Sequence, residues 1–209
     1  MPRPQCARCQ RPQSHCLCSL IPALASKTSV LILQHPSEAG HALNTARLAA
    51  LGLLNAQLHI GEVFEDELLA ADGVENYLLF PGEQALSLSA LNERPGPRRL
   101  IVPDGTWRKA SKLLHLNPHL ASLPRVALPD GLVSRYRLRK APMPGALSTV
   151  EAIVVALNSL EGDLRFDALL RPFEALINSQ IEAMGAEVFQ RNHGPLRSAG
   201  RQRSQPEDI

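Results

Sequence analysis

The sequence predicts an α/β fold, with a mainly parallel sheet and flanking helices, preceded by a small cysteine-rich segment. Short apolar segments alternate along the chain with amphipathic segments of helical period, which is typical of parallel sheets. All four cysteines fall within the first 18 of the 209 residues. Hydrophobic residues make up 44% of the chain and charged residues 20%, which is the composition of a globular protein able to bury a core.

Five apolar segments predict the strands, at residues 28–34, 56–60, 76–80, 98–102 and 125–128. Three of these segments end in proline, glycine or polar residues, at 34–36, 81–83 and 103–107. Ligands of open α/β sheets bind outside the carboxyl ends of the strands. We therefore expect the functional site where these three loops meet.

Segments of helical period predict the helices, at residues 41–54, 66–71, 106–116, 149–160 and 166–191. Ser148 and Glu151 form a capping box before the fourth of them, and Pro172 predicts a break in the last. The C-terminal tail is polar and rich in arginine, and we expect it to be disordered. These features divide the chain into a cysteine-rich segment at 1–26, an α/β domain at 27–191 and a tail at 192–209.

No part of the sequence predicts a membrane span or a secretory signal. The longest apolar runs, at 29–33 and 77–80, are far shorter than the roughly 20 residues of a spanning helix. No apolar stretch follows the N-terminal charge of Arg3. We therefore expect a cytoplasmic protein that does not bind membranes.

The four cysteines, Cys6, Cys9, Cys16 and Cys18, predict a structural zinc site. Disulfides would be spread through the chain and would need an oxidising compartment, which the sequence does not signal. Two close pairs joined by a short turn can surround Zn²⁺ with four thiolates, which leaves no coordination position open for water. His15 could replace one thiolate, and redox thiols or an iron–sulfur cluster remain open alternatives.

The net charge of +2 conceals a segregated charge pattern. Residues 61–93 contain eight acidic and no Lys or Arg side chains, whereas residues 94–140 contain eleven Lys or Arg side chains and two acidic ones. Arginine outnumbers lysine in the basic stretch, which suits bidentate phosphate contacts. The pattern predicts a polyanionic partner such as nucleic acid, and the competing interpretation is a set of ordinary solvated faces.

The segment Asp104-Gly105-Thr106-Trp107 is the most informative candidate for chemistry. It follows a predicted strand and opens a predicted helix, so that Asp104 would lie near free backbone N–H groups. A purely structural interpretation makes Asp104 or Thr106 a helix cap and Trp107 a core anchor. His35, after the first predicted strand, is a candidate base or RNA contact, and its structural alternative is an ordinary buried histidine.

Residues 134–140 alternate cations with other residues and include one tyrosine, as a phosphate-contacting strand or loop would. The structural alternative is a charged solvent edge. The candidate RNA-binding residues are His35, Arg108, Lys109, Arg135, Arg137 and Arg139. Aromatic residues make up only 4% of the chain, so we do not expect a broad base-stacking surface.

Six motifs in a fixed order resemble one protein family. They are C-x2-C-x2-R-P-x3-C-x-C, Q-H-P-x-E, N-T-A-R-L, L-F-P-G, P-D-G-T-W-R-K-A and L-S-T-V-E-A. Their ordered combination resembles the DTW-domain family, the tRNA-uridine aminocarboxypropyltransferases, over about three quarters of the chain. Asp104, Thr106 and Trp107 match the Asp-Thr-Trp element of the family, with Gly105 between the first two.

The resemblance implies a definite reaction, partner and fold. Members of the family transfer the 3-amino-3-carboxypropyl group of S-adenosylmethionine to N3 of a uridine in tRNA, which gives acp3U and releases methylthioadenosine. Bacterial relatives suggest a uridine of the variable loop. The resemblance also implies a SPOUT-like fold, in which C-terminal loops are knotted around the cofactor. We expect tRNA as the partner and no obligate protein partner.

This chemistry assigns roles to the candidate residues. Uridine N3 carries a proton, so a general base is needed, and the sulfonium carbon must lie in line with N3. Asp104 is the candidate base, or it holds the amino group or sulfonium of the cofactor instead. Thr106 and Trp107 complete the candidate catalytic set. The candidate cofactor pocket consists of Pro81, Gly82, Gly105, Leu147, Ser148, Thr149 and Glu151.

Two other classes of function stay open. The first is a SPOUT-type RNA methyltransferase that uses the same cofactor, and the mass of the product separates it from an aminocarboxypropyltransferase. The second is a non-catalytic zinc-ribbon protein that binds RNA. Turnover of the cofactor to methylthioadenosine would exclude it.

Overall fold

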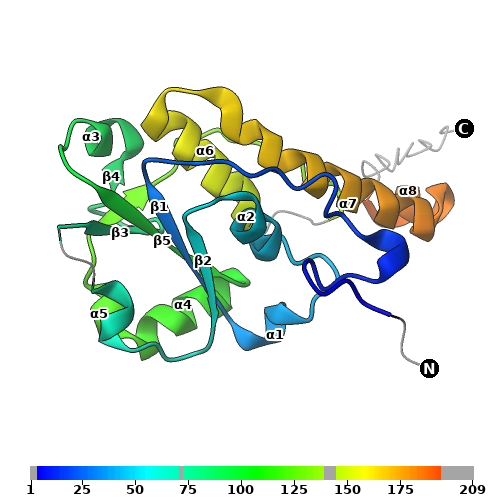
Figure 1. Ribbon diagram of the computed structural model, residues 1–209, viewed down its shortest axis with the longest axis horizontal. Coiled ribbons are helices and arrows are strands. Elements are labelled where there is room, and N and C mark those ends of the chain that lie inside the picture. The colour runs from blue at the N-terminus through cyan, green and yellow to red at the C-terminus, as the bar shows by residue number, and fades with distance from the viewer. Residues whose placement is uncertain (1–3, 71–72, 139–144, 194–209) are drawn as a thin grey trace, which may run out of the picture.

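A six-stranded, fully parallel sheet forms the centre of the protein (Figure 1). The computed structural model describes residues 4–70, 73–138 and 145–193. The strand order is β2-β1-β5-β3-β6-β4. The strands are β1 (Ser29–Gln34), β2 (Ala56–Ile60), β3 (Glu75–Leu79), β4 (Leu86–Ser87), β5 (Arg98–Asp104) and β6 (Arg125–Ala127). This confirms the predicted α/β class and the parallel sheet.

The α-helices of the described residues follow most of the strands. They are α1 (Pro36–Ala39), α2 (Ala46–Gly52), α3 (Leu88–Asn92), α4 (Trp107–Leu116), α5 (Pro118–Ala121), α6 (Thr149–Glu161), α7 (Leu170–Met184) and α8 (Ala186–His193). Three short 3₁₀ helices are η1 (Gln13–His15), η2 (Asp66–Leu69) and η3 (Leu164–Leu169). None of the helices that the structure describes is long and apolar enough to cross a bilayer.

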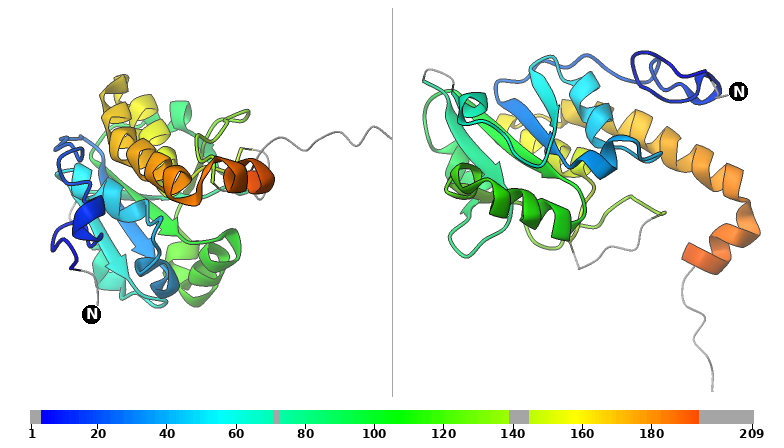
Figure 2. Two further views of the ribbon diagram at one scale, coloured as in Figure 1. Left: turned by 90° about the vertical axis from the view of Figure 1, so that its right-hand side faces the viewer. Right: turned by 90° about the horizontal axis from the view of Figure 1, so that it is seen from below.

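Helices cover both faces of the sheet (Figure 2). In β1, Val30 and Ile32 pack into the core that includes α2, α6 and α7, whereas Leu31 and Leu33 pack into the core that includes α4 and α5. All four side chains are at most 1% exposed. Because the strand is buried on both faces, it is a continuous apolar run in the sequence rather than an alternating one.

The connections between the strands bring β5 to the middle of the sheet. From β1 the chain passes to β2 on one side and then crosses to β3 on the other, and β5 inserts between β1 and β3. The strand order therefore reverses at β5, and crevices at such a reversal are where open α/β sheets bind ligands. The end of β5 carries Asp104.

The strand predicted at 98–102 was too short, because β5 continues through Pro103 to Asp104. Pro103 pairs with Leu33 in register, and Asp104 pairs with Gln34. The Asp104 carbonyl accepts a hydrogen bond from the His35 backbone N–H at 3.0 Å. Asp104 is thus held in the hydrogen-bonded sheet rather than in the following loop.

Several predicted helices have different bounds in the structure. The helix predicted at 41–54 is shorter and spans Ala46–Gly52, with Thr45 as its N-cap. The Asn44 side chain accepts a hydrogen bond from the Arg47 N–H in its first turn at 3.1 Å. The helix predicted at 66–71 is the 3₁₀ helix η2. The sequence did not predict α1, α3, α5 and β4, whose lengths of two to five residues are too short to show a period.

The predicted long C-terminal helix is divided into η3, α7 and α8, and the break expected at Pro172 is absent. Pro172 lies in the first turn of α7, where backbone N–H groups have no helical partner, so the ring is tolerated there. The chain turns instead at Gly185, whose φ of 83° is easily reached only by glycine.

The cysteine-rich segment packs on the α/β core rather than standing apart from it (Figure 1). Cys9, Leu17 and Ile21 are 3%, 7% and 8% exposed and belong to the same core cluster as α2, α6 and α7. The backbone of Leu24 bonds with Gly52 and Leu54, at 2.9 Å each. The segment therefore shares the main core.

We predict that Gly52→Ala destabilises the protein. A Cβ atom at this position would lie 2.3 Å from Cδ2 of Leu169, which is itself fully buried and cannot move aside. Such overpacking costs about 1–3 kcal/mol of unfolding free energy. Gly40→Ala is the control, because a Cβ there meets nothing within 4 Å. Urea unfolding measures both, and equal midpoints for the two variants would contradict the prediction.

Candidate functional site

The Asp104 carboxylate lies at the carboxyl end of β5 and is only 8% exposed. Gln34, at the end of β1, donates a hydrogen bond from Nε2 to Asp104 Oδ2 at 2.7 Å. Thr149, the first residue of α6, donates its hydroxyl hydrogen to Asp104 Oδ1. Three elements therefore hold the carboxylate, and a carboxylate oxygen can accept more than one hydrogen bond, so these contacts are compatible with a role in binding a reactant or ligand.

The residues after Asp104 shape the start of α4. Thr106 is the N-cap, and its side chain accepts a hydrogen bond from the Lys109 N–H at 3.4 Å. A Cβ on Gly105 would lie 3.0 Å from Cβ of Lys109, so glycine allows the helix to approach the strand end closely. The structural interpretation of Thr106 as a cap is confirmed, and Asp104 does not cap this helix.

Trp107 is half-buried and contacts Phe80, which follows β3. The two ring centroids are 5.3 Å apart, and the guanidinium of Arg125 lies 5.7 Å from the centre of the Phe80 ring. Arg125 also donates a hydrogen bond to the Pro81 carbonyl at 3.0 Å, and a Cβ on Gly82 would lie 2.9 Å from its side chain. Pro81 and Gly82 therefore form a close-packed loop beside the aromatic pair.

Glu151 is buried and binds its own chain. Its carboxylate accepts hydrogen bonds from the N–H and hydroxyl of Ser148 at 2.8 and 2.6 Å, from the Ser134 hydroxyl at 2.9 Å and from the Arg135 N–H at 2.6 Å. The predicted capping box is confirmed. These contacts tie the loop around residue 134 to the start of α6, so Glu151 stabilises the loop rather than offering a free carboxylate.

Two hollows lie beside this loop. A cleft of about 200 Å³ is lined mainly by apolar side chains and includes Leu147; its apolar residues are Leu132, Val133, Leu147, Val154, Val155 and Leu170. A larger groove of about 410 Å³ lies against α7, and Arg135, Arg137, Glu174, Ile177 and Asn178 line it. The larger groove contains none of the candidate cofactor residues but two of the candidate RNA-binding arginines.

Acidic residues neutralise part of the basic stretch. Lys109 bonds with Glu38 at 2.6 Å, and His35 with Glu62 at 2.8 Å. The His35 side chain is only 11% exposed, and its other ring nitrogen lies 2.9 Å from the Ser37 hydroxyl. Both of these candidate RNA-binding side chains are therefore already paired within the protein.

The remaining cations differ in their surroundings. Arg108 is exposed, and among the described residues no ion pair includes it. Arg135 pairs with Glu174 at 2.9 Å, and Arg137 donates a hydrogen bond to Asn178, so α7 holds both. Arg139 lies outside the described residues.

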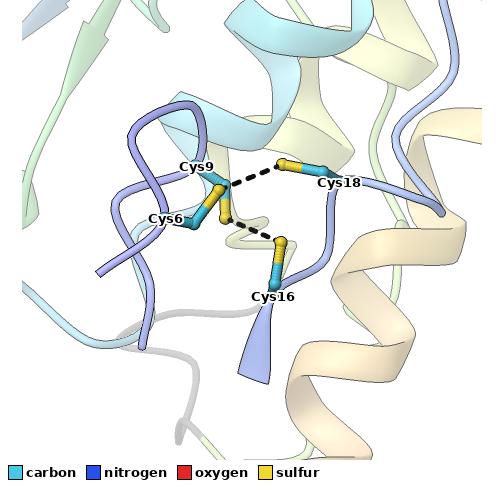
Figure 3. Close-up of side chains that lie close together, drawn as sticks. All are labelled: Cys6, Cys9, Cys16 and Cys18. Carbon is cyan, nitrogen blue, oxygen red and sulfur yellow. Dashed lines mark hydrogen bonds between the residues drawn. The ribbon is translucent and has the colours of Figure 1, made fainter. Parts of the chain in front are cut away.

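The four cysteine sulfurs converge on one point, as Figure 3 shows. All lie within 4.8 Å of one another, with Cys6 and Cys18 at 3.6 Å and Cys9 and Cys16 at 3.8 Å. Four sulfurs bound tetrahedrally to Zn²⁺ at about 2.3 Å would lie about 3.8 Å apart. Disulfide sulfurs would be separated by about 2.05 Å. The geometry of the thiols therefore fits a four-coordinate structural metal site.

The thiols also differ in their pKa values. Backbone N–H groups of Cys9 and Arg8 lower the pKa of the Cys6 thiol to about 6, whereas burial raises the pKa of the Cys18 thiol to about 12. Opposite shifts are expected of two close thiols that share one proton. Binding of a divalent metal would displace that proton.

Comparison with known proteins places the chain in a family. The DTW domain model matches residues 3–181. The chain belongs to the DTW-domain family. It is 34% identical over 200 residues to tRNA-uridine aminocarboxypropyltransferase 2 of Macaca fascicularis and 33% identical over 198 residues to that of Mus musculus, with 89% of this chain covered in each case. It is 32% identical over 192 residues to the Drosophila melanogaster protein of the same name, covering 86% of this chain and 76% of that relative.

This DTW chain spans 66% of the length of the macaque and mouse relatives. No solved structure is significantly similar to it. The family element Asp104-Gly105-Thr106-Trp107 begins at the strand end where the sheet order reverses.

Two residues of the candidate site, Gln34 and Asn44, were not among the candidates selected from the sequence. Both lie in motifs of the family, Q-H-P-x-E and N-T-A-R-L. Gln34 is fully buried at the end of an apolar strand, and a buried amide needs polar partners. A polar residue that ends an otherwise apolar strand was therefore the signal that could have identified Gln34.

We predict one Zn²⁺ per chain at the four cysteines, and a lower Tm when a chelator removes it. The free energy of metal binding is lost from the folded state, and the segment shares the main core through Cys9, so the loss should affect the whole unfolding transition. Elemental analysis and thermal unfolding with and without chelator measure both effects.

Cys9→Ser is the control for this experiment, since its Tm should no longer respond to the chelator. A native wild-type protein that contains no zinc, and whose four thiols all react freely with a thiol reagent, would contradict the prediction.

Proposed function

We propose that this protein is a tRNA-uridine aminocarboxypropyltransferase, which transfers the 3-amino-3-carboxypropyl group of S-adenosylmethionine to N3 of a uridine. The observation that carries the proposal is the position of Asp104. This carboxylate of the family element is nearly buried, is oriented by two hydrogen-bond donors, and lies where the sheet order reverses. The names of the curated relatives support the transfer of an aminocarboxypropyl group to a tRNA uridine.

The proposed reaction is a substitution at carbon. The N3–C bond forms as the C–S bond breaks, methylthioadenosine leaves with the bonding pair, and the N3 proton passes to a base. S-adenosylmethionine supplies a sulfonium leaving group and a positive charge. Asp104 can accept the N3 proton or hold the ammonium group of the cofactor, since both roles need an ionised carboxylate that is held in a fixed orientation.

The other residues of the proposed site are assigned by their places in the fold. Thr149 contacts it directly, and Ser148 and Glu151 cap the helix that carries Thr149. We assign Pro81, Gly82, Gly105 and Leu147 to the walls of the cofactor pocket, and Thr106 and Trp107 to the catalytic element. In this assignment Glu151 acts through the loop that it holds and not by contact with the cofactor.

For tRNA, the proposal assigns phosphate contacts to the exposed arginines. Arg108 lies in the first turn of α4, next to Trp107, and Arg135 and Arg137 border the groove against α7. His35 and Lys109, paired with Glu62 and Glu38, are assigned to positioning the neighbouring loops at the tRNA surface. A cytoplasmic location, a SPOUT-like knot and a variable-loop uridine are further parts of the proposal that await direct tests.

Nucleoside mass spectrometry of tRNA incubated with the protein and S-adenosylmethionine tests the function. We expect a uridine that carries the aminocarboxypropyl group, and stoichiometric methylthioadenosine. A methylated nucleoside would instead identify a SPOUT-type methyltransferase. Binding of tRNA without turnover of the cofactor would identify a zinc-containing RNA-binding protein.

We predict that Asp104→Asn lowers acp3U formation by about 10²–10⁴-fold if Asp104 is the base. If Asp104 holds the cofactor, the variant should instead bind S-adenosylmethionine weakly and recover at high cofactor concentration. Single-turnover rates across cofactor concentration and pH separate the two roles. Wild-type rates under all conditions would exclude both roles.

We predict that replacing Arg135 and Arg137 by alanine makes tRNA binding less dependent on salt. The slope of the logarithm of the binding constant against the logarithm of the salt concentration should become shallower, by about one unit for each phosphate that the variant no longer neutralises. Lys112→Ala is the control, because Lys112 belongs to the same basic stretch but lies on α4, outside the groove that Arg135 and Arg137 line. Binding measured across salt concentrations gives both slopes. An unchanged slope in the double variant would place the tRNA surface elsewhere.

A further inference from the structure

Two amide side chains, those of Gln34 and Asn44, lie together beside Asp104, and Asn44 has no role in the reaction as proposed so far. Gln34 is fully buried and Asn44 is half-buried. Gln34 Nε2 donates a hydrogen bond to Asn44 Oδ1 at 3.1 Å, and Asn44 Nδ2 donates one to Gln34 Oε1 at 3.3 Å. The two amides thus form a reciprocal pair next to the carboxylate.

The surroundings of Asn44 allow only one orientation of its amide. Asn44 Nδ2 faces the carbonyl oxygens of Glu38 and Ala39, at 3.3 and 3.2 Å, near the end of α1. Asn44 Oδ1 accepts the Arg47 N–H at 3.1 Å at the start of α2. Rotating the amide by half a turn would place its oxygen against two carbonyl oxygens and its NH₂ group against a backbone donor. The backbone of two helices therefore determines which end of Asn44 faces Gln34.

The orientation of Gln34 follows from that of Asn44. Gln34 Oε1 must face the Asn44 NH₂ group, so the Gln34 NH₂ group faces Asp104. Its two hydrogens are both used, one on Asn44 and one on Asp104 Oδ2. The pair can therefore present only a donor, never an acceptor, to the carboxylate.

We infer that Gln34 and Asn44 are positioning residues that set the direction and charge of the Asp104 carboxylate. Gln34 donates a hydrogen bond to Oδ2 and Thr149 donates one to Oδ1. Together these bonds oppose rotation of the carboxylate plane and hold its lone pairs in one direction. Donors on both oxygens also favour the ionised form, which both a base and a ligand for an ammonium group require. This inference rests on the proposed function and applies to either role of Asp104.

The chemistry of the pair makes a distinctive test possible. Gln34→Leu keeps most of the side-chain volume but removes the donor, and misplacement of the carboxylate should lower the rate by about 10²-fold. Gln34→Glu keeps the shape of the side chain, but the introduced carboxyl group can donate a hydrogen bond to Asp104 only when it is protonated. The variant has two adjacent carboxyl groups, the one introduced at position 34 and that of Asp104, and together they titrate with a lower and an upper pKa. Below the upper pKa the two groups share a proton, which replaces the amide donor. Above that pKa two close carboxylates repel each other.

Gln34→Glu should therefore approach the wild-type rate at low pH and lose activity, relative to wild type, as the pH rises. Expected losses are about tenfold per pH unit above the upper pKa of the two carboxyl groups. Among the residues that the structure describes, three titratable groups on the neighbouring elements bond to other partners: His35 with Glu62, Glu38 with Lys109, and Glu151 with Ser148. The Arg47 backbone contact with Asn44 also remains.

Asn117→Asp is the matched control, because Asn117 is also a buried amide with three hydrogen bonds but lies at the far end of α4. Asn117→Asp should lower thermal stability without adding a pH range in which the rate falls relative to wild type. Cofactor binding by calorimetry and single-turnover rates, each measured across pH, show whether the Gln34 variants affect KM or kcat.

The outcomes separate the two levels of the proposal. If wild-type protein makes no aminocarboxypropyl-uridine, the proposed function is wrong and the inference falls with it. If wild type is active, but folded Gln34→Leu and Gln34→Glu keep the wild-type rate and pH profile, the positioning role is wrong and the function stands. A Gln34→Glu profile that falls with rising pH, together with low Gln34→Leu rates at every pH, supports the inference.

Discussion

The parallel register between β1 and β5 is the constraint on which the rest of the site depends. It places Gln34 opposite Asp104 at the edge of the sheet that α6 also reaches through Thr149. Both strands are apolar on both faces, so the hydrophobic pattern alone distinguishes weakly between registers. A slip of one residue would turn Asp104 to the other face and leave buried polar groups without partners, at a cost of about 1–3 kcal/mol for each. The polar contact therefore specifies the register and builds the site in the same step.

The fold class and most of the sheet could be predicted because buried parallel strands are continuous apolar runs. The capping box at Ser148 and Glu151 could also be predicted, because it depends on four consecutive residues. The end of β5 could not, since Pro103 and Asp104 continue the strand only through their pairing with β1. The absence of a break at Pro172 depends on where α7 begins, because Pro172 lies in its first turn. Tertiary contacts decide such bounds, and local sequence does not contain them.

The residues of the candidate site also divide into those that could be predicted from the sequence and those that could not. Asp104 and the cysteines could be selected from the sequence, because their residue types and spacing limit their chemistry. The partners of the cations could not: Glu38 meets Lys109 across 71 positions, and Glu62 meets Lys112 across 50. The number of cations counted along the sequence was therefore larger than the number available to bind a polyanion. Glu62 and Asp66 of the acidic stretch bond with side chains of the basic stretch, so the two stretches also stabilise one another in the fold.

The shared core of the cysteine-rich segment has a consequence for the order of events during synthesis. Cys9, Leu17 and Ile21 leave the ribosome before every strand of the sheet, yet they pack in one cluster with α7, which emerges near the end. The thiols lie close together in the chain and can capture a metal early, since the site closes over only thirteen residues. The apolar side chains of the cysteine-rich segment, in contrast, stay exposed until α7 has been synthesised. An early metal-bound turn would keep those side chains on a compact scaffold until the C-terminal helix arrives to cover them.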